Sequence, residues 1–589
     1  MQRFNLTIFK QFWSIAKSYW SSEEKWRARG LLLLVVILSL GYTGLSVMLN
    51  SKRGELISAL SAKDESRFWQ TILIFVGILA VYAPLYAGYV YLRARLGLQW
   101  RQWLTDNFVD RYFQNRAFYN LNHVATIDNP DQRIAEDVKS FTHESLHLLL
   151  AVVDSLLAIG AFSSVLWGIS KPLIGFLILY ALIGTLTTVG VFGKPLMQLN
   201  FEQLKKEADF RFSLVRVREN AEAIAFYQGE QYESEQIKHR FVEVFDNLKR
   251  LIFWELNLNI LTNAYEFIPF VLPAIVVAPG IFAGELEIGK VTEAQGAFIR
   301  VFFSLNLIVA RFQSLTTFGA GVERLYTFLQ SLENSGSIST VVDTEFNATD
   351  KSTETEETSD ILTTIKIQTA DQLALKNMTL QTPNGQRTLV ADLSINLPQG
   401  EGLLVRGPSG CGKSSLLRSI VGLWDTGSGT ILRPPLEQML FLPQKLYMVL
   451  GTLRDQLLYP KVDMEVDDQH LRQILLQVNL PNLEQRHGGF DAEQNWGEVL
   501  SLGEQQRLIF ARLLLNKPSY AILDEATSAL DPQNEKNLYE QLQLSGMTFL
   551  SVGHRESLSD YHRSILDLTA TQNWSLKNSP STINNTLVS

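Results

Sequence analysis

Residues Gly407–Ser414, "GPSGCGKS", bring three glycines, a lysine and two serines together in eight positions. Their spacing fits G-x-x-x-x-G-K-[ST], in which glycines let backbone N–H groups surround phosphate oxygens. Lys413 would contact the β- and γ-phosphates and Ser414 would bind Mg²⁺. The preceding "GLLVR" favours a strand and the following "SSLLRSIVGLW" a helix, which is the context that such a loop needs. The predicted ATP and Mg²⁺ loop comprises Gly407, Pro408, Ser409, Gly410, Cys411, Gly412, Lys413, Ser414 and Ser415.

The segment "YAILDEATSALD" begins with an apolar run, and two carboxylates follow that run directly. Asp524 would complete the Mg²⁺ shell, and Glu525 would polarise the attacking water as a general base. The alternative is a strand end with solvated acids. We also predict that Asp531, at the end of this stretch, contacts the nucleotide.

Two further polar residues follow apolar strands. Gln444, in "FLPQK", could sense Mg²⁺ and the attacking water. His554, in "LSVGHR", could donate a hydrogen bond to the γ-phosphate and assist catalysis. A lone histidine at a strand end is more often structural, so its functional interpretation depends on the ordered set of motifs.

A second phosphate-facing element occurs in "VLSLGEQQR", where Ser501 and Gly503 stand at the start of a predicted helix. The free N–H groups at a helix start suit an anion. We therefore include Ser501, Gly503 and Glu504 among the nucleotide-site residues. Two phosphate-facing elements in one chain raise the question of how many chains build one site.

Composition places these motifs in a membrane protein. The chain has 589 residues, of which 46% are hydrophobic, and its formal net charge is −8. A mean hydropathy of +0.04 is high for a soluble protein. The negative charge gives no indication of a nucleic-acid partner. Cys411 is the one cysteine, which excludes a disulfide within the chain and a cysteine-based metal cluster.

Long apolar runs fill the first part of the chain, and each is long enough to cross a bilayer. We predict six spans, of which the last two contain charges, at Leu31–Leu49, Phe68–Leu92, Leu148–Ser170, Pro172–Gly193, Leu251–Ala283 and Ala294–Gly319. Arginine and lysine follow the second and fourth spans, so the two long links and the N-terminus should be cytoplasmic. Both links are predicted to be helical extensions that project from the bilayer and return.

The N-terminus, "MQRFNLTIFKQFWSIAKSYW", has an amphipathic pattern. Phe4, Ile8, Phe12, Ile15 and Tyr19 fall near one helical face. We expect a helix in the membrane interface. The alternative is an ordinary N-terminal helix. No cleavable signal peptide is evident.

Polar residues recur along one face of the fifth and sixth predicted spans. Charges inside a membrane usually face a water-filled cavity or one another. We expect a polar cavity for a hydrophilic solute; the alternatives are internal pairing, such as Glu266 with Arg300, or an interfacial position. Asp154, in the third span, is a weaker candidate. The predicted cavity residues are Glu255, Asn259, Asn263, Glu266, Arg300, Ser304 and Arg311.

Pattern changes along the chain define its expected organisation. Residues 334–360 are rich in Ser, Thr and acidic residues and are predicted to be a flexible linker. The predicted segments are an interfacial helix (1–29), an all-α membrane domain with six helices (30–333), the linker (334–360), an α/β P-loop ATPase domain (361–572) and a C-terminal tail (573–589).

The ordered motifs resemble a known family. Gly407–Ser414, Gln444, "LSLGEQQR", "ILDEATSALD" and His554 look like an ABC transporter nucleotide-binding domain. Six spans followed by one such domain resemble a half-transporter of the exporter-type fold. "NPDQRIAEDV", "ENAEAIAFYQGE" and "FLPQKLYMVLGTLRDQLLYP" resemble subfamily D, the peroxisomal acyl-CoA carriers with a cobalamin-related member, and its bacterial relatives.

That resemblance answers the question of the two phosphate elements. In the family, the loop at Ser501–Gly503 of one chain covers the γ-phosphate held by Lys413 of another, so the working unit is a dimer. A homodimer would have two equivalent sites. The family's signature is commonly Leu-Ser-Gly-Gly-Gln, but here Leu502 and Glu504 replace the first Gly and the Gln. Thr382 stands near the place of the family's adenine-stacking aromatic residue.

The resemblance implies an ATP-driven transporter in membrane lipid, moving a small or peptide solute, with its nucleotide domain in the cytoplasm. The bacterial relatives favour import of a hydrophilic, cobalamin- or peptide-like solute, and the bacterial inner membrane as location. The alternatives are a lipid, drug or acyl-CoA exporter of the same architecture, or an ATP-gated channel. The predicted spans exclude a soluble ABC ATPase.

Overall fold

A computed structural model describes residues 6–121, 130–307, 311–337 and 364–579. The chain divides into a helical unit, Met1–Lys351, and an α/β unit, Ser352–Ser589. The predicted linker lies largely outside the described residues. Helix α13 continues to Ser337, past residue 334, where the linker was predicted to begin. The fold class agrees with the prediction of a helical membrane domain and an α/β domain.

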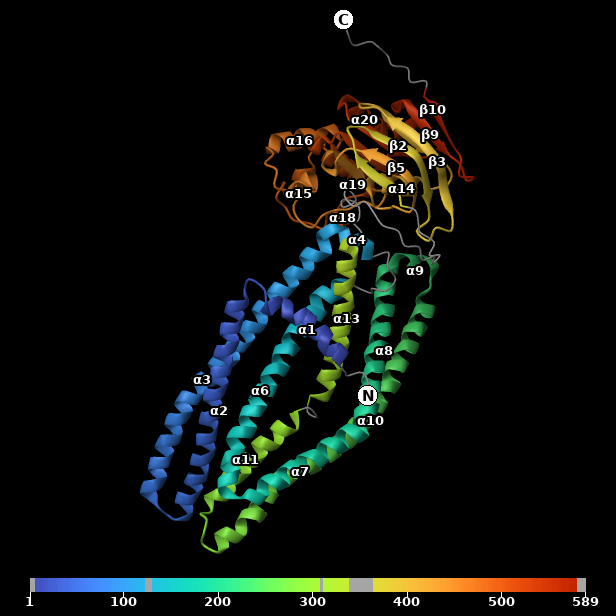
Figure 1. Cartoon of the computed structure of the whole chain (residues 1–589). Helices are drawn as coiled ribbons and strands as arrows, with labels where there is room; N and C mark the ends of the chain where they lie inside the picture. The colour runs from blue at the N-terminus through green and yellow to red at the C-terminus, as the bar shows by residue number, and fades with distance from the viewer. Residues whose placement is uncertain (1–5, 122–129, 308–310, 338–363, 580–589) are drawn as a thin grey trace, which may run out of the picture. The chain divides into compact units, whose positions relative to one another are not determined.

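The helical unit consists of long, nearly antiparallel helices (Figure 1). Its elements are α1 Leu6–Trp20, α2 Lys25–Ser61, α3 Glu65–Phe113, η1 Gln114–Arg116, α4 Ala117–Leu121, α5 Pro130–Gln132, η2 Arg133–Asp137, α6 Val138–Ile169, α7 Lys171–Thr188, η3 Val189–Gly193, α8 Lys194–Glu219, α9 Ala221–Tyr227, α10 Glu230–Phe282, α11 Gly289–Leu305 and α13 Phe312–Ser337.

The membrane spans agree with the prediction in five of six places. Within the described residues, five helices are long and apolar enough to cross a membrane, the last of them Glu230–Phe282. The sixth predicted span, Ala294–Gly319, is not one continuous helix, because α11 ends at Leu305 and α13 begins at Phe312. Its amphipathic sequence, with Arg300 and Arg311, explains why hydropathy alone placed it poorly.

The helices α2 and α11 approach each other closely at glycines. A Cβ atom at Gly289 would lie 1.9 Å from the carbonyl oxygen of Gly54, so no larger residue fits there. Ser58 Oγ accepts a hydrogen bond from the Gly289 N–H at 3.1 Å. This contact fixes the start of α11 against α2 through direct backbone packing.

The N-terminal helix α1 packs on the other helices of its unit. Ile15 and Tyr19 are fully buried, and the Tyr19 ring stacks on Trp100 with centroids 5.7 Å apart. The predicted apolar face is therefore covered largely by protein. Phe9 and Trp13 remain exposed on another face, and the interfacial position of α1 stays a prediction.

The α/β unit contains two sheets. One has the strand order β1-β5-β2-β3 and the other β10-β9-β4-β8-β7-β6. In the second sheet all neighbouring pairs from β9 to β6 are parallel. Strand β10 pairs antiparallel with β9, so residues 574–578 belong to the sheet and do not form the tail that we predicted from residue 573.

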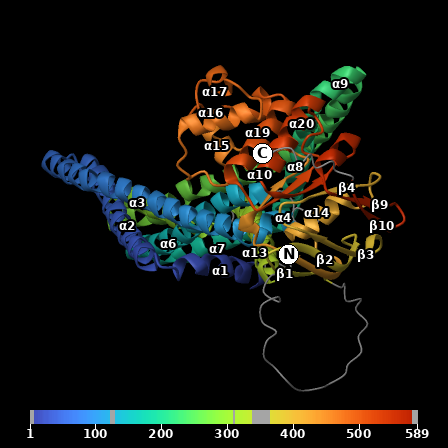
Figure 2. The same cartoon turned by 90° about the horizontal axis from the view of Figure 1, so that it is seen from above.

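The elements of the α/β unit are β1 Lys366–Thr369, β2 Leu373–Gln381, β3 Thr388–Leu397, β4 Gly402–Arg406, α14 Lys413–Val421, β5 Gly427–Arg433, η5 Leu436–Gln438, β6 Met439–Leu442, α15 Leu453–Leu458, α16 Asp468–Gln477, α17 Leu483–Arg486, α18 Trp496–Val499, α19 Leu502–Asn516, β7 Tyr520–Asp524, α20 Pro532–Leu544, β8 Thr548–Val552, η6 Glu556–Tyr561, β9 Ser564–Leu568 and β10 Trp574–Asn578. Figure 2 shows α15, α16 and α17 gathered at one side of this unit and β1, β2 and β3 at another.

A buried histidine packs beside the parallel sheet. His562 is fully buried, and its ring centroid lies 5.0 Å from Phe549 and 5.5 Å from Tyr539. Its Nδ1 donates a hydrogen bond to the Leu558 carbonyl oxygen at 2.6 Å. Burial lowers the pKa of His562 from 6.5 to about 4. The folded unit therefore disfavours the protonated ring.

Acidification from pH 6.5 to pH 4 is expected to destabilise β8 by about 3 kcal/mol through His562. Because the pKa in the folded state is lower, the unfolded state takes up the proton first. The stabilisation is complete above pH 6.5 and is lost as the pH falls toward 4. Hydrogen exchange of the β8 amides at several pH values measures this loss.

The variant His562→Phe is the control. It keeps the ring contacts but loses the bond to Leu558, so it should be less stable at neutral pH and depend less on pH. Equal pH slopes in the two proteins would show that His562 is not the titrating group.

Candidate functional site

The parallel sheet brings distant motif residues to one edge. The phosphate loop follows β4, Asp524 ends β7, Gln444 follows β6 and His554 follows β8. These strands are neighbours in one parallel sheet, so their carboxyl ends share an edge. Ligands of open α/β sheets bind in this position. The predicted catalytic and phosphate-binding residues therefore meet although they are far apart in the sequence, from Gly407 to His554.

The loop at Gly407–Ser414 has the backbone that a phosphate cradle requires. Gly407, Gly410 and Gly412 have φ angles of 152°, 78° and 103°. A Cβ atom at Gly407 would lie 2.5 Å from the Leu568 carbonyl oxygen, so glycine is required there. Lys413 Nζ donates to the carbonyl oxygens of Gly407 and Pro408 at 2.9 and 3.0 Å. The ammonium group thus lies within the loop, where it fits a phosphate.

Ser414 and Asp524 form a pair of oxygen donors beside this loop. Ser414 Oγ donates to Asp524 Oδ1 at 3.3 Å. The pKa of Asp524 is raised overall. Burial and the charge of Glu525 raise this pKa by more than the hydrogen bond from Ser414 lowers it. No cluster of three or more His, Cys, Asp or Glu side chains suited to a metal occurs in the described part of the chain. A hydroxyl and one carboxylate fit Mg²⁺, which takes its remaining oxygens from phosphate and water.

Glu525 lies between the two polar residues predicted to assist it. Gln444 Nε2 donates to Glu525 Oε2 at 2.9 Å, and His554 Nε2 lies 3.3 Å from Glu525 Oε1. Glu525 has φ = 50°, in the left-handed region that a glutamate rarely adopts. Its N–H donates to the Val552 carbonyl oxygen at 3.1 Å, which holds this backbone. Strain of this kind clusters at functional sites.

The second phosphate-facing element is a capped helix start. Ser501 is the N-cap of α19, and Glu504 completes the capping box. The two predicted phosphate-facing elements of the α/β unit, Ser501–Gly503 and the loop at Gly407–Ser414, therefore share no hydrogen bond among the described residues.

Asp531 has a local structural role in the fold. Its Oδ1 accepts hydrogen bonds from the N–H groups of Gln533 and Asn534, each at 3.0 Å, and it caps α20. These hydrogen bonds lower the pKa of Asp531, and the bonds from Asn534 contribute most to the shift. Its predicted contact with a nucleotide stays a prediction. Thr382 is half-buried in the hairpin between β2 and β3, where its Oγ1 donates to Asn384 Oδ1 at 2.7 Å.

Sequence reasoning missed several residues that connect the motifs. Gln506 is buried on α19, bonds to Ser528 Oγ at 3.2 Å and accepts from the Ala529 N–H at 3.0 Å. Arg555 donates to the Ser528 carbonyl oxygen at 3.1 Å. These two side chains tie the stretch after Glu525 to α19 and to the segment of His554. Their proximity to the motifs was the only signal in the sequence.

Arg512 is a buried cation on the same helix. It donates to the Tyr447 carbonyl oxygen at 2.9 Å, to Gln456 Oε1 at 3.0 Å and to the Gln456 carbonyl oxygen. Burial lowers the pKa of Arg512 to about 10. The side chain links α19 to the segment that follows Gln444.

The predicted cavity residues of the helical unit are mostly exposed in the single chain. Asn259, Asn263, Glu266 and Arg300 are exposed, whereas Glu255, Ser304 and Arg311 are half-buried. Among the described residues no ion pair joins Glu266 to Arg300. Arg311 donates to His147 Nε2 at 3.2 Å, and the Ser304 hydroxyl bonds to the Arg300 carbonyl oxygen. The internal-pairing alternative therefore has no support in these contacts.

Asp154 lies between three helices and has partners on two of them. It accepts hydrogen bonds from Tyr89 Oη on α3, at 2.6 Å, and from Ser39 Oγ on α2. Its carboxylate is therefore satisfied by the chain itself, which favours the structural interpretation of this residue.

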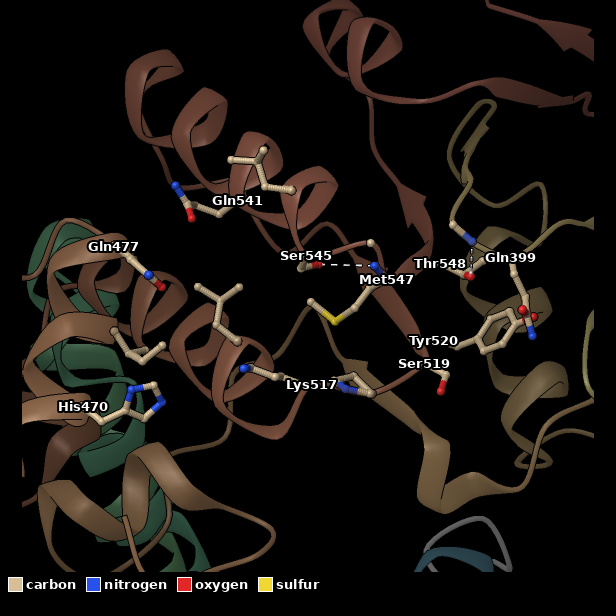
Figure 3. A pocket seen from close by; sticks show the side chains of 16 residues that line it. Gln399, His470, Gln477, Lys517, Ser519, Tyr520, Gln541, Ser545, Met547 and Thr548 are labelled. Atoms are coloured by element: carbon tan, nitrogen blue, oxygen red, sulfur yellow. Dashed lines mark hydrogen bonds between the residues drawn. The ribbon is translucent and has the colours of Figure 1, made fainter. Parts of the chain in front are cut away.

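A pocket of about 590 Å³ lies elsewhere in the α/β unit, between α16, α19, α20 and the starts of β7 and β8 (Figure 3). Its Ser545 and Thr548 hydroxyls already accept from the N–H groups of Met547 and Gly400. None of the predicted site residues lines it. Because it opens at the amino ends of the strands, it is separate from the phosphate loop.

Comparison with known proteins covers both units. A family model described as ABC transporter transmembrane region 2 matches residues 15–282, and one described as ABC transporter matches residues 390–528. An uncharacterized ABC transporter ATP-binding protein of Synechocystis is 44% identical, with 94% of this chain and 83% of that protein covered. The chloroplastic ABC transporter D family member 2 of Arabidopsis thaliana is 39% identical, with 96% and 86% covered. A lysosomal cobalamin transporter of Mus musculus is 31% identical, with 98% and 97% covered.

Proposed function

The chain belongs to the ABC transporter family, and from that premise we propose that two copies of it form a pump for a hydrophilic solute. The protein is an integral membrane protein that binds ATP, and it is an ATPase coupled to transport. The solute, the direction of transport, the homodimer and the bacterial inner membrane belong to the proposal.

The polar row on α10 is the observation that carries the solute class. Asn259, Asn263 and Glu266 are exposed on a helix whose neighbouring residues are apolar, and Arg300 is exposed on α11. If these side chains faced lipid, their burial would be energetically unfavourable, because polar and charged groups lose their hydration inside a membrane. A water-filled cavity between two copies would hydrate them and would suit a hydrophilic solute. The mouse relative carries the name of a cobalamin transporter, so cobalamin belongs among the solutes to test.

Exposed apolar side chains on the extensions of α8 and α10 support the homodimer. Phe212 on α8 and Phe241 and Phe245 on α10 are exposed in the single chain. They lie outside the fourth and fifth predicted spans, where water and not lipid would surround them. Large exposed apolar patches usually mark interaction sites. A second copy of the chain would cover them.

The proposed chemistry uses residues of the described site. When bound, Mg²⁺ would neutralise phosphate charge and hold the β- and γ-phosphates in place. Lys413 and the loop N–H groups bind the phosphates, and Ser414 and Asp524 supply oxygen ligands. Glu525 takes the proton of the attacking water, and Gln444 and His554 hold its carboxylate in place. Ser501 and Gly503 of a second chain cover the γ-phosphate.

Solute movement in sealed proteoliposomes tests this function. Labelled hydrophilic solutes, cobalamin included, start at equal concentration on both sides, and ATP is added only outside. Only molecules with outward-facing nucleotide domains then work, so depletion of the lumen means import and accumulation means export. Because the solutes start at equal concentration, a channel produces no net movement, so ATP consumption without net movement would contradict the proposed pump for these solutes and favour the ATP-gated channel or another solute class.

The short helix α9 is expected to transmit closure of the nucleotide domains to the spans. It forms the turn between α8 and α10, and its Phe226 and Tyr227 are 78% and 88% exposed. The double variant Phe226→Ala/Tyr227→Ala should still bind ATP. Its ATP-driven solute movement should fall about tenfold, because exposed aromatic residues are frequent anchors of protein contacts. Flux per ATP hydrolysed measures this.

The variant Phe282→Ala is the matched control, since it removes an equally exposed aromatic ring at the other end of α10. It should leave flux per ATP unchanged. Equal losses in both variants would mean that α9 has no special role.

A further inference from the structure

Glu504 already binds the groups that the proposed function assigns to the γ-phosphate. Its Oε2 accepts from the Ser501 N–H and from Ser501 Oγ, each at 3.0 Å. The Ser501 hydroxyl in turn accepts from the Glu504 N–H at 3.3 Å. A side-chain carboxylate thus stands at the start of α19, where a phosphate of the second copy is proposed to arrive.

This carboxylate presents an electrostatic problem. Burial raises the pKa of Glu504, but the bonds from Arg486 and Ser501 outweigh it, so the pKa is lowered and the group is charged at neutral pH. Two anions at one helix start would repel each other. The commoner glutamine at this position, inferred from the family resemblance, would not create this repulsion.

Arg486 is the cation that faces Glu504. Its Nη2 donates to Glu504 Oε1 at 2.7 Å. Arg486 ends the short helix α17, and the chain turns away at Gly488 and Gly489, whose φ angles are 92° and 105°. The acid of α17 itself, Glu484, is paired with Arg472 at 3.2 Å, so Arg486 remains directed to Glu504 on α19. About half of the Arg486 side chain stays exposed, at 51%.

We propose that Arg486 is a positioning residue for ATP, which neutralises Glu504 and so allows the start of α19 to accept the γ-phosphate held by a second copy. This inference rests on the proposed function. Arg486 acts through Glu504 and not by binding the nucleotide itself. When the phosphate arrives, Ser501 exchanges its bonds to Glu504 for bonds to the phosphate, while Glu504 stays paired with Arg486.

The test measures kcat and KM for ATP in five full-length proteins reconstituted in lipid. These are the wild type, Arg486→Gln, Glu504→Gln, the double variant and Arg472→Gln. We expect Arg486→Gln to raise KM about tenfold, because it leaves Glu504 uncompensated. Glu504→Gln should lower KM about threefold. The double variant should return to within about threefold of the wild type, since both charges of the pair are gone.

Arg472→Gln is the matched control. It removes a similarly exposed arginine, 52% against 51%, from a pair with the same short helix, so its KM should equal that of the wild type. Thermal unfolding without ATP, measured on all five proteins, separates a loss of stability from a loss of ATP affinity.

Each outcome has a separate meaning. An unchanged KM in Arg486→Gln overturns the inference, and so does a double variant as impaired as Arg486→Gln, because that result would place Arg486 on the phosphate directly. A KM that rises only in proportion to lowered thermal stability would make the pair structural and would also overturn it. A wild type without ATPase activity would instead contradict the ATPase coupling on which the proposed function depends.

Discussion

Glu525→Gln is expected to lower kcat for ATP hydrolysis at least about 100-fold while ATP binding persists, since a general base contributes about 10²–10⁴-fold. The amide has nearly the shape of the carboxylate and can still accept the hydrogen bond that Gln444 donates at 2.9 Å. It cannot take up the proton of the attacking water. The variant should therefore hold ATP and accumulate as a closed dimer.

Two measurements check this expectation. Phosphate release gives kcat, and retention of labelled ATP by the reconstituted protein shows whether the variant still holds the nucleotide. Glu540→Gln on α20 is the control, because this exposed glutamate pairs only at the surface with Lys536, at 3.8 Å. Normal turnover by Glu525→Gln would remove Glu525 from its assigned role, and loss of ATP binding would make its role structural.

The strained backbone at Glu525 predicts a separate effect of substitutions at this position, on thermal stability. A glutamate at φ = 50° costs free energy that the Val552 contact and the surrounding strands must offset. Asn, Asp and Gly tolerate this region better than other residues. Glu525→Gly should therefore relieve strain and raise thermal stability relative to Glu525→Gln, although both are expected to be inactive. Such a difference would separate the conformational role of this position from its chemical role.

The nucleotide site was predictable from sequence because its residues follow strands. A parallel sheet brings the carboxyl ends of its strands together, so each motif after an apolar strand was expected at one edge. The structure brings Ser414 to Asp524 and both Gln444 and His554 to Glu525, as this reasoning required. The roles of these residues remain predictions.

Features that depend on side chains far apart in the sequence were not predictable. Nothing around Arg486 in "LEQRHGG" indicates that it faces Glu504, because the contact depends on the positions of α17 and α19. The left-handed backbone of Glu525 and the burial of His562 also arise from the packed sheet. Asp531 was assigned to the nucleotide by its place in a motif, whereas its hydrogen bonds show a helix cap.

The membrane spans were predictable where hydropathy was uniform. The first five predicted spans match helices that are long and apolar enough to cross a bilayer. The sixth contains Arg300 and Arg311, and α11 ends between them at Leu305. Polar residues that face protein or water lower hydropathy without preventing a membrane position. Composition therefore could not place the end of α11 or the start of α13.

Mixed dimers should show that one ATP site uses two chains. Lys413→Ala removes the ammonium that is proposed to bind phosphate. Gly503→Asp places a carboxylate beside the start of α19, where it would repel phosphate while suiting the helix itself. A Cβ atom at Gly503 has room, because its nearest neighbour is the Ala529 carbonyl oxygen at 3.5 Å. Each homodimeric variant should therefore fold and lose ATPase activity about 100-fold or more.

Two heterodimers, isolated with two different affinity tags, distinguish the arrangements. In the first, one chain carries Lys413→Ala and the other carries Gly503→Asp. In the second, one chain carries both changes and the other is wild type. If each site combines Lys413 of one chain with Gly503 of the other, the first heterodimer has one intact site and the second has none. If each site lies within one chain, the opposite holds.

We expect the first heterodimer to retain about half of the wild-type ATPase activity, because separated sites usually act additively, and the second to show only background. The composition of the two heterodimers is the same, so differences in folding or lipid cannot produce this contrast. Activity confined to the second heterodimer would place each site within a single chain. Background activity in both would mean that neither site works unless its neighbour is intact. Ser501–Gly503 and Lys413 share no hydrogen bond within the described α/β unit, so we expect the first heterodimer to have the higher ATPase activity.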